Sequence, residues 1–360
     1  MAGVYISYPF CAQKCTYCNF ASGVFPRSLE DDYQRVLVAE IARHIFEWRP
    51  DTVYLGGGTP SSMEPAALEA ILAAVPGKPW MEATLEASPG TITADKARSW
   101  RACGINRISL GVQSFVRPEI AATGRKHTAE TVVGDLVTLR QAGIANFNID
   151  LIAGLACQTM ASWRQSLDWI EKLEAPHVSV YMLEIDEDSR LGRETLLGGV
   201  RYGAANIPSE TETADMYEFA VERLEALGIR RYEISNFARP GFESVHNLKY
   251  WRLLPYIGFG ADAHSFDGAL RWQNVESPAE YVACGAGPRP ATANLSEEKF
   301  FVGLRLLAGI RPTVDEWRIF AAPIRRFVNE GLLKSQGDTL RLTSRGVMLS
   351  NEIFQEFLNL

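Results

Sequence analysis

The chain has 360 residues, of which 47% are hydrophobic and 22% are charged, as in an ordinary globular protein. Its net charge of -7 argues against nucleic acid as the main partner, because phosphate binding needs a basic surface. The first residues do not read as a secretory signal, and no apolar run approaches the ~20 residues that cross a bilayer. We therefore expect a cytoplasmic protein with one large domain and a smaller one.

Short apolar runs rich in β-branched residues alternate with longer segments of helical period in the first half of the chain. We predict strands at residues 4–7, 52–55, 83–86, 107–112, 146–151 and 177–182. We predict helices at residues 28–46, 65–75, 94–103, 129–142 and 161–173, with Ser28 and Asp31 at the spacing of a capping box. This alternation implies an α/β fold whose parallel sheet is either doubly wound or curled into a partial barrel.

The pattern changes after residue 184. We predict a loop at 191–208, a helix at 210–227, an irregular aromatic segment at 239–268 and a Gly/Pro linker at 287–292. From residue 296 the pattern is mostly helical, with a hairpin whose turn lies at 335–338. The expected domains are a β/α core over 1–184, an extension of that core that faces the ligand over 185–290, and a small helical domain over 291–360.

Three of the six cysteines, Cys11, Cys15 and Cys18, lie within eight residues at the spacing C-x3-C-x2-C. A closed zinc site normally takes four protein ligands, and the next histidine in the sequence is His44. Three thiolates suit a [4Fe-4S] cluster with one iron left open for chemistry. A zinc site completed by a distant residue and simple buried thiols are the rival interpretations. The scattered Cys103, Cys157 and Cys284 are interpreted as buried small hydrophobes.

The segment from Tyr8 to Phe20, which contains these cysteines, resembles the cluster loop of the radical S-adenosylmethionine (SAM) superfamily. The resemblance implies a partial (β/α)6 barrel with a small helical C-terminal domain. It also implies that SAM chelates the open iron, and that one electron from the cluster cleaves SAM to a 5′-deoxyadenosyl radical. In such proteins the cofactor supplies the chemistry and the protein positions it.

Further motifs follow in the order that this superfamily shows. Leu55 to Ser61 reads LGGGTPS at the end of the second predicted strand, where glycines let the backbone approach a ligand. Arg125 is expected to pair with the SAM carboxylate, and Asp150 places a carboxylate in an apolar strand, which is costly unless it is paired or functional. By resemblance, the residues expected to contact SAM are Tyr5, Tyr17, Gly57, Gly58, Thr59, Glu86, Gln113, Arg125 and Asp150. The alternative for each is a turn residue or a structural hydrogen bond.

The order of these elements resembles one branch of the superfamily, which contains oxygen-independent coproporphyrinogen III oxidase and the HemW-type haem chaperones. Phe20 stands where the oxidase has a fourth cysteine, and we expect no long N-terminal arm of the oxidase kind, because the cysteines begin at residue 11. Residues 246–251 read HNLKYW and match the HNxxYW motif of the HemW type.

The HNxxYW motif suggests a haem site, because neutral imidazole is a good axial ligand for haem iron. His246 is the candidate ligand, with Tyr250 and Trp251 placed to lie against the porphyrin. The alternative is that His246 caps a loop and the aromatic residues fill the seam between domains. His264 is a second candidate, but its small neighbours are more typical of a packed turn.

These features predict a haem chaperone that uses a [4Fe-4S] cluster, SAM and haem, and that hands haem to respiratory haemoproteins. Its contact with a membrane would be peripheral, through those acceptors. The alternative is an oxidase that decarboxylates the propionates of coproporphyrinogen III by hydrogen abstraction. A zinc-binding structural protein is the third and weakest hypothesis.

Overall fold

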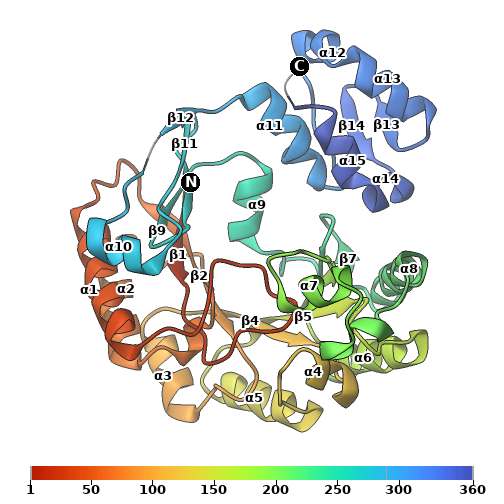
Figure 1. Cartoon of the computed structure of the whole chain (residues 1–360). Coiled ribbons are helices and arrows are strands. Elements are labelled where there is room, and N and C mark those ends of the chain that lie inside the picture. Colours follow the sequence, from red (N-terminus) through yellow and green to blue (C-terminus); the bar gives the residue numbers. More distant parts are fainter. Residues whose placement is uncertain (1, 289, 359–360) are drawn as a thin grey trace.

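The computed structural model describes residues 2–288 and 290–358. Its centre is a sheet of six neighbouring parallel strands in chain order, as predicted. They are β1 (Ala2–Tyr8), β2 (Pro50–Gly57), β3 (Glu82–Ala87), β4 (Arg107–Gln113), β5 (Asn146–Ala153) and β6 (His177–Met182). The sheet curves into an open barrel with helices on its outer side (Figure 1), so the partial-barrel alternative is confirmed.

Helices connect each pair of parallel strands, because a parallel pair needs a long crossover connection. They are α1 (Arg27–Arg43), α2 (Pro65–Ala74), α3 (Ala94–Ala102), α4 (Arg117–Ala122), α5 (Ala129–Gln141) and α6 (Met160–Lys172). The strands are buried by these helices, as the run from Val4 to Ile6 shows at one edge and Val178 to Val180 at the other. Parallel strands covered in this way read as nearly continuous apolar runs, which is why the sequence pattern located them.

The start of α1 differs from the prediction. The helix begins after Pro26, whose fixed backbone angle suits the entry to a helix, and no side chain caps it. The predicted capping box at Ser28 and Asp31 is therefore wrong, and Asp31 instead pairs with Arg27 at 3.2 Å. The helix also ends at Arg43 rather than at residue 46, because His44 is extended.

The sheet continues beyond these six strands to twelve strands in all. On one side are β9 (Tyr256–Phe259), β10 (His264–Phe266), β11 (Leu270–Gln273) and β12 (Ala291–Thr292), and on the other β8 (Asn236–Ala238) and β7 (Arg230–Arg231). Of these, β9 pairs parallel to β1. The segment 239–268, predicted as irregular, thus holds two strands and helix α9 (Val245–Trp251). The predicted linker ends in strand β12, and its residue 289 lies outside the described residues.

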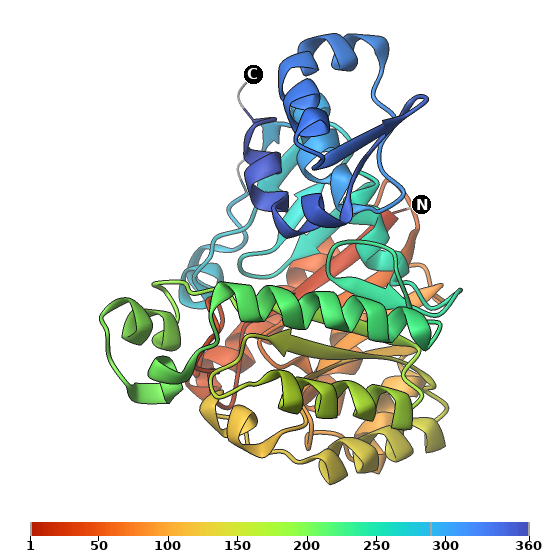
Figure 2. The same ribbon diagram turned by 90° about the vertical axis from the view of Figure 1, so that its right-hand side faces the viewer.

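The predicted loop at 191–208 is wrong, because it contains helix α7 (Arg190–Leu196) and the 3-10 helix η2 (Arg201–Asn206). These elements form a lobe that stands out from the barrel beside the long helix α8 (Glu210–Ala226), as Figure 2 shows. Helix α8 is confirmed, and its capping box is formed by Ser209 and Glu212. Helix α10 (Pro278–Cys284) packs against α1 on the opposite side of the molecule.

The C-terminal region is mostly helical, as predicted. It contains α11 (Leu295–Phe301), η3 (Gly303–Arg305), α12 (Val314–Ile319), α13 (Ala321–Asn329), α14 (Ser344–Met348) and α15 (Ser350–Gln355). The hairpin of β13 (Leu333–Gln336) and β14 (Thr339–Leu342) turns at Gly337, which has a φ of 62°. Phe300, Phe320 and Phe357 are buried together at the centre of this region. Among the described residues, no helix has the length and apolar character to cross a membrane.

Candidate functional site

The cysteine loop follows β1, and hydrogen bonds between backbone groups close its base. The N–H of Cys11 donates to the carbonyl of Gly23 at 2.8 Å, and the N–H of Gly23 donates to the carbonyl of Pro9 at 2.9 Å. Cys11, Cys15 and Cys18 lie on the loop between these contacts, and each is partly exposed. The chain therefore presents the three thiols from a loop whose two ends are held together.

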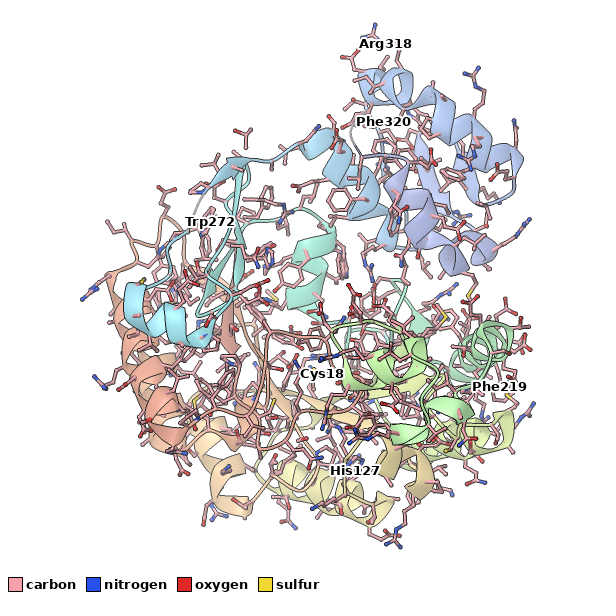
Figure 3. The ribbon with its side chains drawn as sticks, in the orientation of Figure 1. Cys18, His127, Phe219, Trp272, Arg318 and Phe320 are labelled. Carbon is pink, nitrogen blue, oxygen red and sulfur yellow. The ribbon has the colours of Figure 1, made fainter. Side chains whose placement is uncertain are left out.

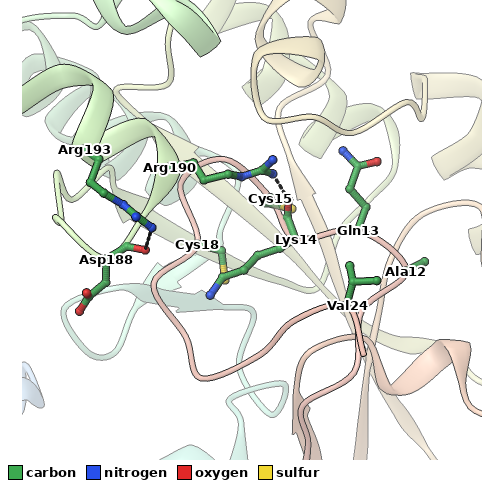
Figure 4. Close-up of a pocket in the computed structure, with 9 residues that line it drawn as sticks. All are labelled: Ala12, Gln13, Lys14, Cys15, Cys18, Val24, Asp188, Arg190 and Arg193. Atoms are coloured by element: carbon green, nitrogen blue, oxygen red, sulfur yellow. Dashed lines mark hydrogen bonds between the residues drawn. The ribbon is translucent and has the colours of Figure 1, made fainter. Parts of the chain in front are cut away.

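The tip of the loop is held by two other parts of the chain. Thr16 donates its N–H to the carbonyl of Thr123 at 3.1 Å and its hydroxyl to that of Ala122 at 2.9 Å, at the end of α4. The N–H of Leu191, in α7, donates to the carbonyl of Thr16 at 2.7 Å. Figure 4 shows the outer face of the loop, where Arg190 and Lys14 lie beside the cysteines. Helix α7, which sequence reasoning missed, thus supports the cysteine loop.

The three thiols lie close enough to influence one another. Burial raises the pKa of Cys11, and the charges of Cys18 and Cys15 raise it further. Within residues 2–288 and 290–358, no three His, Cys, Asp or Glu side chains are arranged so that they could hold a single metal ion.

The remaining cysteines correct part of the sequence analysis. Cys103 is buried, as predicted. Cys157 and Cys284 are exposed, so the interpretation of both as buried hydrophobes is wrong. Cys157 lies outside the core because it occupies a turn with a φ of 68°, and Cys284 is the last residue of the surface helix α10.

The glycine segment at the end of β2 lies directly against the base of the cysteine loop. The N–H of Gly58 donates to the carbonyl of Tyr8 at 2.7 Å, and the N–H of Thr59 donates to that of Phe10 at 2.9 Å. A Cβ on Gly58 would lie 2.6 Å from the Phe10 oxygen, closer than real Cβ atoms approach. Glycine is therefore required here so that the two backbone segments can meet.

A cavity of about 810 Å³ opens between this loop and the C-terminal ends of the parallel strands. Active sites of β/α barrels lie at this end. All the predicted site residues except Tyr5 and His246 line it: Cys11, Cys15, Tyr17, Cys18, Gly57, Gly58, Thr59, Glu86, Gln113, Arg125 and Asp150. Figure 3 labels Cys18 and His127, which also lines the cavity. The structure thus brings together residues that are scattered over 140 positions of sequence.

Glu86, at the end of β3, is a buried acid at the wall of this cavity. Its carboxylate accepts hydrogen bonds from the hydroxyl of Tyr54 at 2.9 Å and from the N–H of Gly57 at 3.1 Å. Burial nevertheless raises the pKa of Glu86 to about 7, and the charge of Asp150 contributes in the same direction. The cavity wall therefore holds a carboxyl group that exchanges a proton near neutral pH.

Asp150 is paired rather than isolated in its apolar strand. Its carboxylate accepts hydrogen bonds from the Asn148 amide at 2.6 Å and from the Ser109 hydroxyl at 3.3 Å. Burial raises the pKa of Asp150, while these hydrogen bonds oppose the rise. These partners offset part of the cost of burying a carboxylate.

Gln113 and Arg125 offer polar atoms that lack a partner within the described protein. Gln113 has a φ of 70° at the end of β4, and its buried Oε1 accepts no hydrogen bond from any described residue. Arg125 donates from Nη1 to the Ser88 hydroxyl at 2.7 Å and to the Gly111 carbonyl at 2.9 Å, while its buried Nε has no partner in the described chain. Buried polar atoms are normally satisfied, so such atoms in a cavity wall suit a polar ligand.

Tyr5 lies one side chain behind the cavity wall. Its ring stacks on that of Tyr54 with centroids 6.1 Å apart, and Tyr54 in turn donates to Glu86. In this structure Tyr5 therefore supports a residue of the wall and does not line the cavity itself.

His246 does not line the cavity. It is fully buried, with Nδ1 hydrogen-bonded to the Thr52 hydroxyl at 2.9 Å and Nε2 to the Tyr250 hydroxyl at 2.8 Å. Burial lowers the pKa of His246 to about 3. Its ring also stacks on that of Tyr54, with centroids 5.3 Å apart, and the Tyr54 hydroxyl donates to Glu86. His246 therefore lies one side chain behind the cavity wall, as Tyr5 does.

The rest of the HNxxYW segment fastens α9 to the barrel. The N–H groups of Val245 and His246 donate to the carboxylate of Glu82, each at 2.9 Å. Lys249 lies 2.7 Å from Asp51, and Trp251 stacks under the guanidinium of Arg305 from the C-terminal region. In this structure the motif joins the amino-terminal edge of the sheet to the C-terminal region, and haem ligation by His246 stays a prediction.

Sequence reasoning did not select every residue of the cavity wall. Ser88 and Tyr181 also line the cavity. The Ser88 hydroxyl accepts a hydrogen bond from Arg125, and Tyr181 lies in β6. His127 has Nε2 3.1 Å from the carbonyl of Val112, and burial lowers its pKa to about 4. The position of His127 two residues after Arg125 was the signal that could have identified it.

Comparison with known proteins agrees with this geometry. Residues 5–170 match the model of the radical SAM superfamily, and residues 293–349 match that of the HemN C-terminal domain. The protein named heme chaperone HemW from Bacillus subtilis is 32% identical, over 99% of both chains. Heme chaperone HemW from Escherichia coli is 30% identical, over 99% of this chain and 97% of its own.

One solved structure is similar throughout. The structure of coproporphyrinogen III oxidase (HemN) from Escherichia coli, a radical SAM enzyme, superposes with a TM-score of 0.83. It covers 99% of this chain and 90% of that chain at 22% sequence identity, a likeness that shows the shared fold. Together with the sequence relatives, these matches show that the chain belongs to the HemW family of the radical SAM superfamily.

Proposed function

We propose that this protein is a haem chaperone that binds a [4Fe-4S] cluster through Cys11, Cys15 and Cys18, binds SAM in the adjoining cavity, and delivers haem to haemoproteins. The full-length relatives named heme chaperone HemW support the haem part of the proposal. The observation that carries the cofactor part is the placement of the three thiols in the wall of the 810 Å³ cavity with the predicted SAM residues.

The residues present suit these cofactors. Three thiolates leave one iron of a cubane open, and a cluster of this kind supplies single electrons when it is bound. The unpartnered Arg125 Nε and Gln113 Oε1 give the cavity a donor and an acceptor for the polar groups of SAM. Glu86 holds the N–H of Gly57 and so fixes the glycine segment on which the methionine part of SAM would lie.

The cluster is tested by iron and sulfide analysis of anaerobically reconstituted protein, with the Cys15→Ser variant and Cys157→Ser as its matched control. We expect about four irons and four sulfides per wild-type chain and per Cys157→Ser chain, and a clear loss in Cys15→Ser. Equal iron content in all three proteins, or zinc in place of iron, would contradict the assignment of the ligands.

Delivery is tested by mixing the haem-loaded protein with the apo form of a respiratory b-type haemoprotein. We expect haem to appear in the acceptor faster than from free haem at the same concentration. Transfer no faster than from free haem, together with turnover of coproporphyrinogen III, would instead favour the oxidase. That alternative shares the fold of the E. coli oxidase, but Phe20 occupies the place of the fourth cysteine of the oxidase.

A further inference from the structure

A row of polar side chains lies behind Asp150 inside the barrel. Ser109, Asn148 and His177 are neighbours on β4, β5 and β6, because the sheet register pairs Asn148 with each of the other two. Asp150 follows Asn148 by two residues, so both side chains are on the same face of β5. Asp150 and Ser109 line the cavity, whereas Asn148 and His177 do not line it and are almost fully buried. The two buried residues therefore support the cavity wall from behind.

The Asn148 amide has one orientation that suits its neighbours. Its Nδ2 donates to the Asp150 carboxylate at 2.6 Å, and lies 2.8 Å from the Ser109 hydroxyl and 2.9 Å from that of Ser179. If the amide were turned over, its oxygen would face the carboxylate, and two acceptors repel each other. The position of the Asp150 carboxylate therefore depends on the direction in which the Asn148 amide points.

His177 fixes that direction from the other side of the amide. Its Nδ1 lies 2.7 Å from Oδ1 of Asn148, and an amide oxygen only accepts, so Nδ1 must carry the proton. Its Nε2 lies 2.8 Å from the hydroxyl of Tyr232, which itself accepts the N–H of Ser244 at 3.2 Å. The hydroxyl proton of Tyr232 is thus free to point at Nε2. All the hydrogen bonds of the row are consistent with this single arrangement of protons.

The arrangement requires a neutral His177. Burial lowers the pKa of His177 well below its ordinary value, and the charge of Arg107 contributes in the same direction. Arg107 is itself buried, with its Nε 3.9 Å from the carboxylate of Glu82. A neutral imidazole donates from one nitrogen and accepts at the other, which is what Asn148 and Tyr232 need.

His246, another buried histidine of the barrel, shows why the partners of His177 matter. Both ring nitrogens of His246 contact hydroxyl groups, those of Thr52 and Tyr250. A hydroxyl group donates or accepts equally well, so these contacts impose no direction on a neighbour. His177 instead faces an amide whose other end holds a carboxylate of the cavity wall.

We propose that His177 is a positioning residue for SAM: through the Asn148 amide it holds the Asp150 carboxylate in the orientation that accepts a hydrogen bond from SAM. The inference rests on the proposed function, because it concerns the proposed SAM cavity. It gives a role in ligand binding to a residue that does not line that cavity.

The test uses two substitutions that each keep half of the imidazole chemistry. The amide nitrogen of asparagine can take the place of Nδ1, so His177→Asn keeps a donor to Asn148 and loses the partner of Tyr232. The longer side chain of glutamine reaches the place of Nε2, so His177→Gln keeps a partner for Tyr232 and loses the donor to Asn148. Both variants lose the packing of the ring, and we expect their thermal unfolding midpoints to fall by similar amounts.

SAM affinity is measured by equilibrium dialysis of the anaerobic, cluster-reconstituted, full-length protein. We expect His177→Gln to weaken SAM binding about tenfold, the lower end of the loss that follows removal of a partner behind a metal ligand. His177→Asn should bind SAM nearly as well as wild type. Asp150→Asn should also weaken SAM binding, and adding His177→Gln to it should cause little further loss, because both changes remove the same contact.

The tautomer of His177 provides a second measurement that needs neither variant to fold. In wild-type protein with 15N-labelled histidine, we expect the NMR signals of a neutral ring with its proton on Nδ1. Tyr232→Phe, which keeps the ring of Tyr232, should shift the Nε2 signal of His177 and so identify it. A proton on Nε2 would contradict the inference, because His177 could then not donate to Asn148.

Three outcomes of the dialysis would overturn the inference. Wild-type SAM affinity in His177→Gln, with the cluster intact, would show that His177 does not position Asp150 and would leave the proposed function standing. Equal losses of SAM affinity in His177→Gln and His177→Asn would show that the ring has only a structural role. Wild-type protein that carries the cluster but binds no SAM would contradict the proposed function itself, and this inference with it.

Discussion

The Thr52 hydroxyl lies 2.9 Å from Nδ1 of His246, near the start of β2. The His246 ring stacks on Tyr54, whose hydroxyl donates to Glu86 in the wall of the 810 Å³ cavity, but His246 itself does not line that cavity. In this structure His246 therefore serves the attachment of α9 to the barrel.

Replacing His246 by alanine should destabilise the fold. The change leaves the buried hydroxyls of Thr52 and Tyr250 without a partner and opens a cavity, which together cost about 2–4 kcal/mol. Thermal unfolding of the variant should occur at a clearly lower temperature than that of wild type, while the exposed His264→Ala stays close to wild type. An unchanged midpoint combined with loss of the haem spectrum would instead assign His246 to haem.

Glu86 makes stability depend on pH. Its pKa is about 7 in the folded chain, against an ordinary value of 4.5, so the native state holds the proton more tightly than the unfolded chain does. This contribution is fully present below about pH 4.5 and is lost as pH rises through 7, by about 3 kcal/mol.

The matched comparison is Glu86→Gln, measured by urea denaturation of the cluster-free chain from pH 5 to pH 8. The variant should gain stability relative to wild type as pH rises, because it cannot lose the proton. If the stability curves of wild type and variant run parallel over that range, burial does not raise the pKa of Glu86.

Gly58 and Gly134 provide a matched pair of glycine substitutions. A Cβ on Gly58 meets the Phe10 carbonyl at 2.6 Å, whereas one on Gly134, in helix α5, meets nothing within 4 Å. Gly58→Ala should therefore lower stability by about 1–3 kcal/mol and reduce iron loading, because it displaces the base of the cysteine loop. Gly134→Ala should raise stability by about 0.5–1 kcal/mol with iron loading unchanged. Full iron loading in Gly58→Ala would show that the cysteine loop can bind iron without the close contact between Gly58 and the Phe10 carbonyl.

Arg125 should contribute to SAM affinity through its guanidinium geometry. Lysine keeps the charge but lacks the planar fork, so Arg125→Lys should weaken SAM binding about tenfold. Equilibrium dialysis of reconstituted protein measures this, with the exposed Arg117→Lys as control. Equal SAM affinity in both variants would remove Arg125 from the proposed SAM contacts.

The parallel core was predictable from sequence because its strands are buried on both faces, which leaves apolar runs such as the one from Val4 to Ile6. Strands β9 and β10 were missed because they have only four and three residues, and glycines interrupt the apolar pattern around them.

The candidate cavity was largely predictable because its residues follow strand ends, where short motifs such as the glycine segment keep their spacing. The place of His246 was not predictable, because its partner Thr52 is 194 residues away in the sequence. Likewise the support that Leu191 gives to Thr16 depends on a helix that was expected to be a loop. In each case the role of the residue depends on a tertiary contact, which cannot be predicted from the local sequence.

Haem binding by this chain is measured by titrating haem into the anaerobic, cluster-reconstituted wild-type protein. We expect saturable binding near one equivalent, with a Soret band distinct from that of free haem. A linear, unsaturable response would show that the chain has no haem site.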